Sequence, residues 1–334
     1  MILGIECTAH TFGVGIVEKG KILANVRDMY KPLKGGIIPT ESAKHHREIA
    51  EKIYQEALLK AGISEREIKS IAVSNAPGLA PCLYEGMYFA KKKAKELGVK
   101  MIGVNHCIAH LEIGQSVGAR DPVLLYASGA NTQIIAFAAG KYRVFGETLD
   151  IGVGNFIDKF ARYIGIGFPG GPEIEKKALG GEYIELPYSI KGMDVSFSGM
   201  QTKLQQLYDK GFKIEDLSFS LQETAFAMLV EAAERAMAHT GKNELVLGGG
   251  VACNARLQEM CKIMCSERNA KYFCPAREFL VDNAAMIAFT GEIMFNSTTF
   301  LRKKGSRSPK NYYSADEIEV KPRERTDDVE VTWK

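Results

Sequence analysis

The chain has 334 residues, with a hydrophobic fraction of 46% and a charged fraction of 25%, as in an ordinary globular protein. This length exceeds the size at which a single core usually stops growing, so we expect two lobes. The formal net charge is only +3, lower than a protein that grips nucleic acid unaided usually carries. No apolar run approaches the roughly 20 residues that cross a bilayer, which argues against a membrane partner.

The cysteines and the first residues indicate the compartment. Seven cysteines are present, and no CxxC pair occurs. An odd count without such a pair argues against a disulfide framework and favours a reducing cytoplasm. The start, MILGIECTAH, lacks the basic stretch and the cleavage site of a signal peptide, so we expect a cytoplasmic protein.

The first part of the chain predicts three strands followed by alternating helices and strands. The strands ILGIE and FGVGIVE form a hairpin, and KILANV adds a third strand. A helix of about 20 residues follows from Ser42 and is closed by Gly62. SIAVSNAPG then predicts a buried strand with a Gly/Pro turn, before a Lys-rich helix, the strand MIGVN and a helix that carries two histidines.

From Asp121 the same order begins again. PVLLYASGANTQIIAFAAGKYRVFGETL predicts three strands with tight turns, and NFIDKFARYIG predicts a helix. A strongly periodic helix ends at Gly241, ELVLGGGVACNARLQEMCKIM predicts strand, glycine turn and helix, and VDNAAMIAFTGEIMF predicts one more helix.

This repetition predicts an α/β protein built from two βββαβα-type halves. Such halves around a nucleotide cleft are the mark of the actin-like (ASKHA) two-lobed fold. We expect an N-terminal lobe over residues 1–118, a C-terminal lobe with a helical insertion over 119–300, and a C-terminal segment over 301–334 whose packing is not predicted.

Three turns have the composition of phosphate-binding loops. GIECTAHTFG and SGANTQ are hairpin turns with small polar residues, whose backbone N–H groups can cradle a phosphate. LGGGVACN ends a buried strand with three glycines and leads into a helix that begins at about Ala252. A single GGG turn is more often tight strand–helix packing, but the order of all three favours a nucleotide cleft.

The stretch VNHCIAHLEIG places His106 and His110 four residues apart, on one face of a helix. Two such histidines can simply cap and pack, or they can hold a metal. The protease motif HExxH has the same spacing, but its general base would stand at Cys107, and a thiol cannot replace a glutamate. We therefore reject protease chemistry.

A metal needs at least three protein ligands, and two more residues are plausible. Tyr126 precedes the second phosphate-type turn, and Asp282 stands at the start of a helix. A set of two histidines, a tyrosine and an aspartate suits iron or zinc, with one position left for substrate. The spacing alone does not join these four residues.

Eight blocks of the sequence resemble the TsaD/OSGEP family, and the resemblance extends over nearly the whole chain. In chain order these blocks are VNHCIAHLEIG, YASGANTQ, FGETLDIGVGNFIDKFAR, FPGGPEIE, KGMDVSFSG, SLQETAFAMLVE, GGGVACNARL and VDNAAMIA. The chain is most similar to the archaeal and eukaryotic branch, whose members work in the KEOPS complex.

The resemblance implies transfer of a threonylcarbamoyl group from threonylcarbamoyl-adenylate to the N6 amine of adenosine 37 in tRNA. It implies one Fe²⁺ or Zn²⁺ ion, held by the residues that match the family's ligands: His106, His110, Tyr126 and Asp282. It also implies an adenine nucleotide or the adenylate in the cleft, which a Mg²⁺ ion can accompany.

The resemblance further assigns the residues that contact the nucleotide. They match at Tyr126, Ala127, Ser128, Gly129, Ala130, Asn131, Asp158, Gly171, Glu175, Gly249, Gly250 and Asn254, and Lys159 is a candidate to reach a phosphate. Outside the family, the two acidic residues Asp158 and Glu175 would simply be helix carboxylates. No catalytic base is assigned, although His10 on the first hairpin is a candidate that could equally be a surface imidazole.

Three positions depart from the family's glycines. Alanine stands at Ala76, Ala130 and Ala284, in turns where the family usually has GPG, SGG and DNG. Each adds a methyl group where a backbone can approach a ligand or adopt a positive φ. An alternative is therefore a nucleotide-binding scaffold with weakened activity.

The partners implied by the resemblance are tRNA, a small atypical protein kinase as a separate chain, and the other KEOPS subunits. Three basic clusters, at 91–95, 302–304 and 321–325, permit an RNA partner without demonstrating one. A kinase of the actin-like fold is a further alternative, but such kinases usually carry an aspartate for magnesium where this chain has Glu6.

Overall fold

The structure is a computed structural model that describes residues 1–32, 36–303 and 312–334. The chain forms two compact units. Unit 1 contains 1–116, 139–142 and 282–334, and unit 2 contains 117–138 and 143–281. Part of the predicted segment 301–334, and Lys304 of the basic cluster at 302–304, lie outside the described residues.

Unit 1 is built on a six-stranded sheet with the order β13-β5-β4-β1-β2-β3. The strands β1 and β2 form the predicted hairpin, β3 extends it antiparallel, and β4 and β5 run parallel to β1. Their bounds are Ile2–Glu6 (β1), Thr11–Glu18 (β2), Lys21–Met29 (β3), Ser70–Ala76 (β4), Lys100–Asn105 (β5) and Tyr312–Tyr313 (β13).

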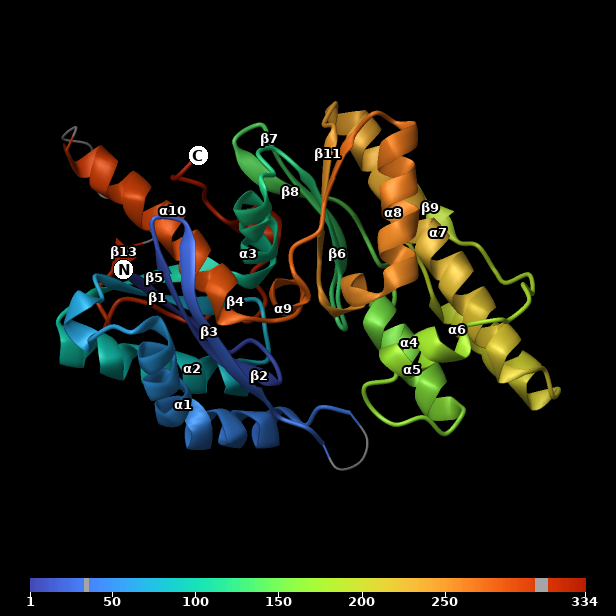
Figure 1. The fold of residues 1–334 in the computed structure, drawn as a ribbon, viewed down its shortest axis with the longest axis horizontal. Coiled ribbons are helices and arrows are strands. Elements are labelled where there is room, and N and C mark those ends of the chain that lie inside the picture. Colours follow the sequence, from blue (N-terminus) through green and yellow to red (C-terminus); the bar gives the residue numbers. More distant parts are fainter. Residues whose placement is uncertain (33–35, 304–311) are drawn as a thin grey trace. The chain divides into compact units, whose positions relative to one another are not determined.

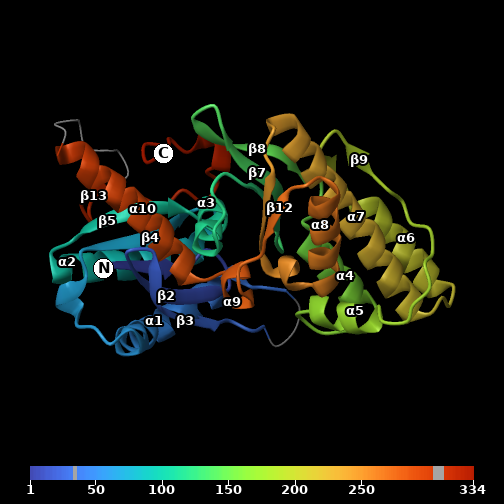
Figure 2. The same cartoon turned by 45° about the horizontal axis from the view of Figure 1, so that its top comes forward.

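Helices cover both faces of this sheet, as Figures 1 and 2 show. The helices α1 (Pro39–Ala61) and α2 (Ala80–Leu97) pack on one face, and α10 (Ala284–Lys303) packs across β1 and β2 on the other. Leu3 and Ile5 of β1 join the core under α1 and α2, because alternate side chains of a strand point to opposite faces. The short helix α3 (His106–Glu112) follows β5 directly and contacts α10.

Two facing glycines let α10 approach the sheet backbone. Gly4 and Gly15 are register partners in β1 and β2. A Cβ on Gly4 would lie 2.3 Å from the backbone nitrogen of Ala288, and a Cβ on Gly15 would lie 2.5 Å from the carbonyl carbon of Ala284. The first turns of α10 therefore rest on the strand backbones themselves.

Unit 2 repeats the strand order of unit 1, with β12-β11-β6-β7-β8 matching β5-β4-β1-β2-β3. Here too the first two strands are antiparallel and the next two run parallel to the first. The predicted duplication is confirmed. The bounds are Val123–Ala127 (β6), Thr132–Ala138 (β7), Lys141–Glu147 (β8), Glu244–Gly248 (β11) and Lys271–Phe273 (β12).

The helices of unit 2 share one apolar core with its sheet. Figure 2 shows α7 beside α6, and α4 beside α5. These helices, with α8 and the short α9, are α4 (Val153–Tyr163), α5 (Gly171–Lys177), α6 (Ser198–Asp209), α7 (Ile214–Thr240), α8 (Ala255–Glu267) and α9 (Arg277–Leu280). A two-stranded ribbon completes the unit, with β9 at Ile190–Lys191 and β10 at Asp194–Val195.

The compact units differ from the predicted division of the chain. The predicted boundary at 118 lies within two residues of the observed change at 116/117, but residues from Asp282 onward belong to unit 1 rather than to the second half. The physical reason is α10, which packs on β1, β2 and β4. The chain thus returns to its first sheet to complete it.

Some details of the predicted elements also change. The helix expected from about Ala252 is a 3-10 turn at Gly250–Cys253 followed by α8, because the Asn254 side chain caps α8 by accepting from Arg256 N and Leu257 N. The predicted ends at Gly62 and Gly241 are confirmed, with φ of 66° and 68°. All seven cysteines are free thiols. Within the described residues, none of the helices is long and apolar enough to cross a membrane.

Candidate metal centre and glycine-rich loops

The two histidines of unit 1 are fixed by the capped start of α3. The side-chain oxygen of Asn105 accepts hydrogen bonds from Cys107 N at 3.1 Å and Ile108 N at 3.3 Å. This cap starts the helix at His106 and places His110 one turn further along the same face. Both imidazoles are buried.

Asp282 is brought to these histidines by the start of α10. The Arg27 guanidinium donates to the carbonyl oxygen of Asp282 at 3.0 Å. The side-chain oxygen of Asn283, which directly precedes α10, accepts from Met286 N at 2.9 Å. A strand and a helix terminus therefore hold the backbone at Asp282, while the glycines of β1 and β2 allow the helix to lie this close.

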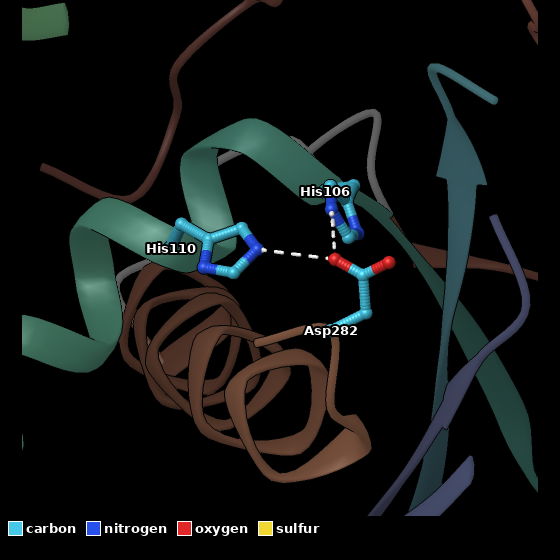
Figure 3. Close-up of side chains that lie close together, drawn as sticks. All are labelled: His106, His110 and Asp282. Carbon is cyan, nitrogen blue, oxygen red and sulfur yellow. Dashed lines mark ion pairs between the residues drawn. The ribbon is translucent and has the colours of Figure 1, made fainter. Parts of the chain in front are cut away.

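The three side chains converge on one point, as Figure 3 shows. One carboxylate oxygen of Asp282, Oδ1, lies 3.3 Å from His106 Nε2 and 3.7 Å from His110 Nε2. The prospective ligand atoms of the three residues all lie within 4.8 Å of one another. Two imidazole nitrogens and a carboxylate oxygen in this arrangement fit the donor set of a divalent transition metal.

The electrostatics of the cluster keep these ligands in the state that a metal requires. Burial lowers the pKa of His110, which favours the neutral imidazole. Burial alone would raise the pKa of Asp282, but the charge of His106 and the close approach of both imidazoles hold it well below its usual value. Metal ligands must be deprotonated to bind, so both shifts suit coordination.

A carboxylate from the first strand orients His106. Glu6, at the end of β1, is fully buried, and its Oε2 lies 3.0 Å from His106 Nδ1. Donation from Nδ1–H to this carboxylate orients the ring and leaves Nε2, which faces Asp282, as the nitrogen that would bind a metal once its proton is lost, which is the usual outer-shell arrangement of a metal-binding histidine. Thr8 supports Glu6, because its backbone N–H and its hydroxyl both donate to Glu6 Oε1.

This role of Glu6 is not among the sequence predictions. The pattern showed only that an acidic residue ends the first strand, and the contact spans 100 positions of the chain. The same turn was predicted as a phosphate cradle, yet two of its N–H groups are engaged inside the protein: Cys7 N donates to Ser74 Oγ and Thr8 N donates to Glu6.

The remaining predicted metal ligand, Tyr126, belongs to unit 2. It is buried on β6, where its register partners are Gln133 of β7 and Gly248 of β11. His106, His110 and Asp282 all belong to unit 1. The structure therefore brings together three of the four predicted ligands within one unit.

Unit 2 brings its two predicted phosphate-type turns together. Gly249 has a φ of 92°, and a Cβ there would lie 2.3 Å from the carbonyl oxygen of Ala127. Gly152 is equally close to the turn, with the carbonyl oxygen of Gly129 at 2.4 Å from a Cβ position. The turn between β6 and β7 thus packs backbone to backbone against the loops before α8 and α4.

Residues of this turn also meet the start of α4. The carbonyls of Ser128 and Gly129 accept from Gly154 N and Asn155 N, both at 3.0 Å. Ser128 and Asn131 remain half-exposed, and Ala130 and Gly250 are exposed. The predicted nucleotide-binding turn is therefore held by hydrogen bonds to the start of α4, and part of it remains accessible to solvent.

The other predicted nucleotide residues lie where α4, α5 and α8 begin or meet. Asp158 Oδ1 accepts from Gly170 N at 2.8 Å, and Glu175 Oε1 accepts from Ala255 N at 2.7 Å at the start of α8. The Asn254 amide donates to Gln222 at 2.8 Å. Lys159 is exposed, and Gly171 opens α5 with free space where a Cβ would stand.

The three alanines that replace family glycines are accommodated by this backbone. Among the described residues, positive φ outside glycine occurs at Lys19, Ala139 and Asn269 only. Ala76, Ala130 and Ala284 therefore adopt conformations open to any L-residue. The methyl group of Ala284 faces Gly13 of β2, and the backbone of Ala284 faces Gly15, where the absence of side chains provides the space.

The basic cluster at 91–95 is largely neutralised. Lys93 is buried and contacts Glu51 at 3.0 Å and Glu96 at 3.2 Å, and Lys95 lies 2.6 Å from Asp316. His10, the candidate base, is half-buried, and its charge lowers the pKa of Asp282. These contacts favour a structural role for the lysines and place His10 within electrostatic reach of the histidine–aspartate cluster.

Comparison with known proteins gives a consistent family. The family model described as "TsaD: tRNA N6-adenosine threonylcarbamoyltransferase" matches residues 21–289. The chain is 52% identical over 333 residues to the tRNA N6-adenosine threonylcarbamoyltransferase of Thermococcus kodakarensis, covering 99% of each chain. It is also 50% identical over 337 residues to a probable bifunctional tRNA threonylcarbamoyladenosine biosynthesis protein of Methanosarcina mazei, covering 99% of this chain and 59% of that protein.

Solved structures confirm the fold class. HypF of T. kodakarensis matches with a TM-score of 0.63 at 14% identity, over 88% of this chain and 47% of that one. The activator of the 2-hydroxyisocaproyl-CoA dehydratase from Clostridium difficile, solved with bound ADPNP, matches with a TM-score of 0.55 at 12% identity, over 92% and 99%. The fold is the predicted actin-like α/β fold. With its full-length relatives and the match over most of its residues, the chain belongs to the TsaD family, the tRNA N6-adenosine threonylcarbamoyltransferases.

Proposed function

We propose that this chain transfers a threonylcarbamoyl group from threonylcarbamoyl-adenylate to the N6 amine of adenosine 37 in tRNA. Family membership over the whole chain supports the reaction class. The observation that carries the proposal is the buried cluster of His106, His110 and Asp282, with Glu6 behind His106. A chain that had lost the activity would not be expected to retain all of these metal-ligand residues together.

We further propose that His106 and His110, through Nε2, and Asp282, through a carboxylate oxygen, hold an Fe²⁺ or Zn²⁺ ion. Imidazole and carboxylate ligands suit both metals. When bound, the ion supplies a Lewis acid that can orient and polarise an oxygen of the donor. The side chain of Asp282 keeps 18% of its surface exposed, against 0% for His110, so the cluster is open on the carboxylate side. Tyr126 as a further ligand remains a prediction from the resemblance.

The adenylate part of the donor is assigned to unit 2. The turn from Ser128 to Asn131 and the exposed Gly250 offer accessible backbone for a closely packed phosphate and sugar, while Ala127 and Gly249 pack the two loops together beneath them. Asp158 and Glu175 each accept a backbone N–H through one carboxylate oxygen, which orients the carboxylate, and carboxylates are acceptors suited to ribose hydroxyls.

The partners proposed are tRNA and a KEOPS-type set of subunits that includes a separate small kinase. The bifunctional relatives are longer than this chain, which matches 59% of the M. mazei protein. A second function in the remainder of those proteins is consistent with a partner that acts beside this chain. The net charge of +3 also favours shared binding of tRNA over binding by this chain alone.

The test is a single-turnover assay with the full chain, its partner subunits, threonylcarbamoyl-adenylate and unmodified tRNA. Mass spectrometry of the digested tRNA should show threonylcarbamoyladenosine. We expect His110→Ala and Asp282→Asn to lose more than about 100-fold in rate, since each removes a ligand. His239→Ala, which changes an exposed imidazole of unit 2, should retain full rate. Absence of product from the wild type, beside an active T. kodakarensis relative, would refute the proposal.

The alternative of an actin-like kinase is not favoured. Such an enzyme would need an acidic group at the first turn available for magnesium, whereas both oxygens of Glu6 are engaged, one with Thr8 and the other with His106. Incubation with ATP and small sugars, with phosphate transfer as the readout, would reveal that activity if it were present.

A further inference from the structure

A second buried carboxylate lies at the other end of the histidine helix. Glu112 is the last residue of α3, two positions after His110, and its surface is fully buried. A buried carboxylate is costly unless charged or polar partners surround it. Gln115, in the turn that follows α3, donates to Glu112 Oε2, and the partners of Glu112 Oε1 come from the C-terminal residues and from the start of β8.

These partners form a connected network, which we call the Glu112 clasp: Glu112, Tyr142, Trp333 and Lys334. The Tyr142 hydroxyl donates to Glu112 Oε1 at 2.5 Å, and Lys334 Nζ lies 2.8 Å from the same oxygen. The Trp333 indole N–H donates to the Tyr142 oxygen at 3.3 Å. Burial, with the charge of Glu112 adding to it, raises the pKa of Tyr142, so the phenol remains a donor.

The clasp is the end of a longer path along unit 1. The chain from 319 pairs with the end of β4, where Lys321 N donates to the carbonyl of Asn75 at 2.8 Å and Gly78 N donates to the carbonyl of Pro322 at 3.1 Å. Further on, burial raises the pKa of the Cys107 thiol and the side chain of the buried Thr326 opposes this rise, so Thr326 lies beside the residue that follows His106. The C-terminal residues thus touch α3 near both of its ends.

The histidine helix is too short to hold its own shape. It has seven residues, fewer than the roughly 12–15 at which isolated helices become stable in water. Asn105 fixes its first turn, whereas its second turn, which carries His110, is held by packing against α10 and by the contacts of Glu112. Metal affinity depends on ligand geometry held to within a fraction of an ångström.

We infer that Glu112 is a positioning residue for the metal centre and that Tyr142, Trp333 and Lys334 act through it. The clasp holds the last turn of α3 so that His110 faces Asp282 at the distance needed to share an ion with His106. This inference rests on the proposed metal-binding function, and its test separates the two.

The experiment measures Co²⁺ and Zn²⁺ affinity on the full metal-free chain by competition with a chromophoric chelator, without any assay of activity. Glu112→Gln keeps the shape of the side chain and removes its charge, and we expect about 10-fold weaker binding. Lys334→Met should weaken binding by about 3-fold, and Lys334→Arg, which restores the cation, should recover most of this loss. The absorption spectrum of bound Co²⁺ should change in Glu112→Gln, because the ligand geometry changes.

The control variant is Lys95→Met, which breaks an exposed ion pair with Asp316 in the same unit, at a site away from α3. Its metal affinity should equal that of the wild type. If the wild type binds neither ion, the proposed metal function fails. If the wild type binds and both Glu112→Gln and Lys334→Met bind equally well, the clasp is merely structural and the inference is overturned. Should Glu112→Gln not fold, the Lys334 pair of variants decides alone.

Discussion

The two hairpins that open the two sheets pair their strands in the same way, but they differ in the size of the side chains at their centres. In unit 1 the central residue of the first strand, Gly4, pairs with Gly15. In unit 2 the corresponding residue, Leu125, pairs with Ile134. Helix α10 therefore lies on bare backbone in unit 1, whereas large side chains join the core with the helices in unit 2.

This difference teaches how one scaffold can carry two kinds of site. Close backbone approach in unit 1 brings the start of α10, and with it Asp282, to the histidine helix. In unit 2 the close approaches are displaced to the strand ends, where Gly152 and Gly249 pack against the turn after β6. Unit 1 thereby gathers two histidines and an aspartate, and unit 2 gathers its glycine-rich loops around one turn.

The largest losses of stability should follow when the central residue of the first strand in each hairpin is replaced by alanine. Gly4→Ala adds a methyl group 2.3 Å from a backbone nitrogen and should lower the free energy of unfolding by about 3 kcal/mol or more. Leu125→Ala removes a buried side chain and should cost about 2–5 kcal/mol through the cavity that it leaves.

Denaturant titration can separate the two variants. The chain has one tryptophan, and Trp333 belongs to unit 1, so its fluorescence follows that unit while circular dichroism follows the whole chain. A Gly4→Ala protein with wild-type stability would show that α10 does not rest on the backbone of β1.

Acid sensitivity that arises from histidines should lie mainly in unit 1, which holds five of the six histidines. Burial, with a smaller effect from His45, lowers the pKa of His46 from 6.5 to about 4. The folded state then binds fewer protons than the unfolded chain between these values. The contribution of this group to stability is complete above pH 6.5 and is lost as the pH falls through about 4, by about 3 kcal/mol in all.

Replacing His46 by leucine should flatten this part of the pH profile of metal-free protein. The measurement is the free energy of unfolding at several pH values between 7 and about 4. His239→Gln provides the control, because His239 is exposed and belongs to unit 2. An unchanged slope in the leucine variant would mean that His46 is protonated in the folded state.

A smaller effect is expected from Glu6, whose counterpart at the end of the first strand of unit 2 is Ala127. Glu6→Gln removes the charge that orients His106 and should weaken metal binding by about 10–100-fold. Zinc affinity measured by chelator competition checks this. Glu85→Gln, which changes a carboxylate paired with Arg47, should leave the affinity unaltered. A Glu6→Gln affinity within twofold of the wild type would remove Glu6 from the metal centre.

The smallest effect concerns a glycine without neighbours. Gly199 lies in the first turn of α6, and no atom stands within 4 Å of its Cβ position. Gly199→Ala should raise the free energy of unfolding by about 0.5–1 kcal/mol, because alanine favours the helix. Thermal unfolding of this variant gives the effect of a Gly→Ala change without a steric clash, with which the loss of stability in Gly4→Ala can be compared. A destabilised Gly199→Ala would show a contact that the structure lacks.

Local chemistry made much of the fold predictable. Strand alternation gave both hairpins, and Gly62 and Gly241 ended α1 and α7 in the left-handed conformation. Helix α6 was not predicted from its own pattern. The return of the chain from unit 2 to unit 1 was not predicted either, because no local pattern states that α10 needs Gly4 and Gly15 opposite it.

The site was predictable only where a family pattern could be matched. His106, His110 and Asp282 were identified in this way, since spacing alone does not join residues so far apart. Glu6 and Glu112 were missed, because each owes its role to a contact with distant residues rather than to its neighbours in the sequence. Both contacts form because the carboxylate is buried and needs polar partners. The burial of a single residue cannot be read from the sequence.

The divided course of unit 1 has a consequence during synthesis. All residues of unit 2, 117–138 and 143–281, and with them its entire apolar core, leave the ribosome before Asp282. Until the residues from Asp282 onward emerge, the face of β1 and β2 that carries Gly4 and Gly15 is not covered by α10. The histidine helix also lacks its aspartate during this time. A nascent chain stalled at about residue 280 should therefore expose apolar surface of unit 1 and be unable to form the metal centre. We expect a chaperone to be most needed at this stage of synthesis.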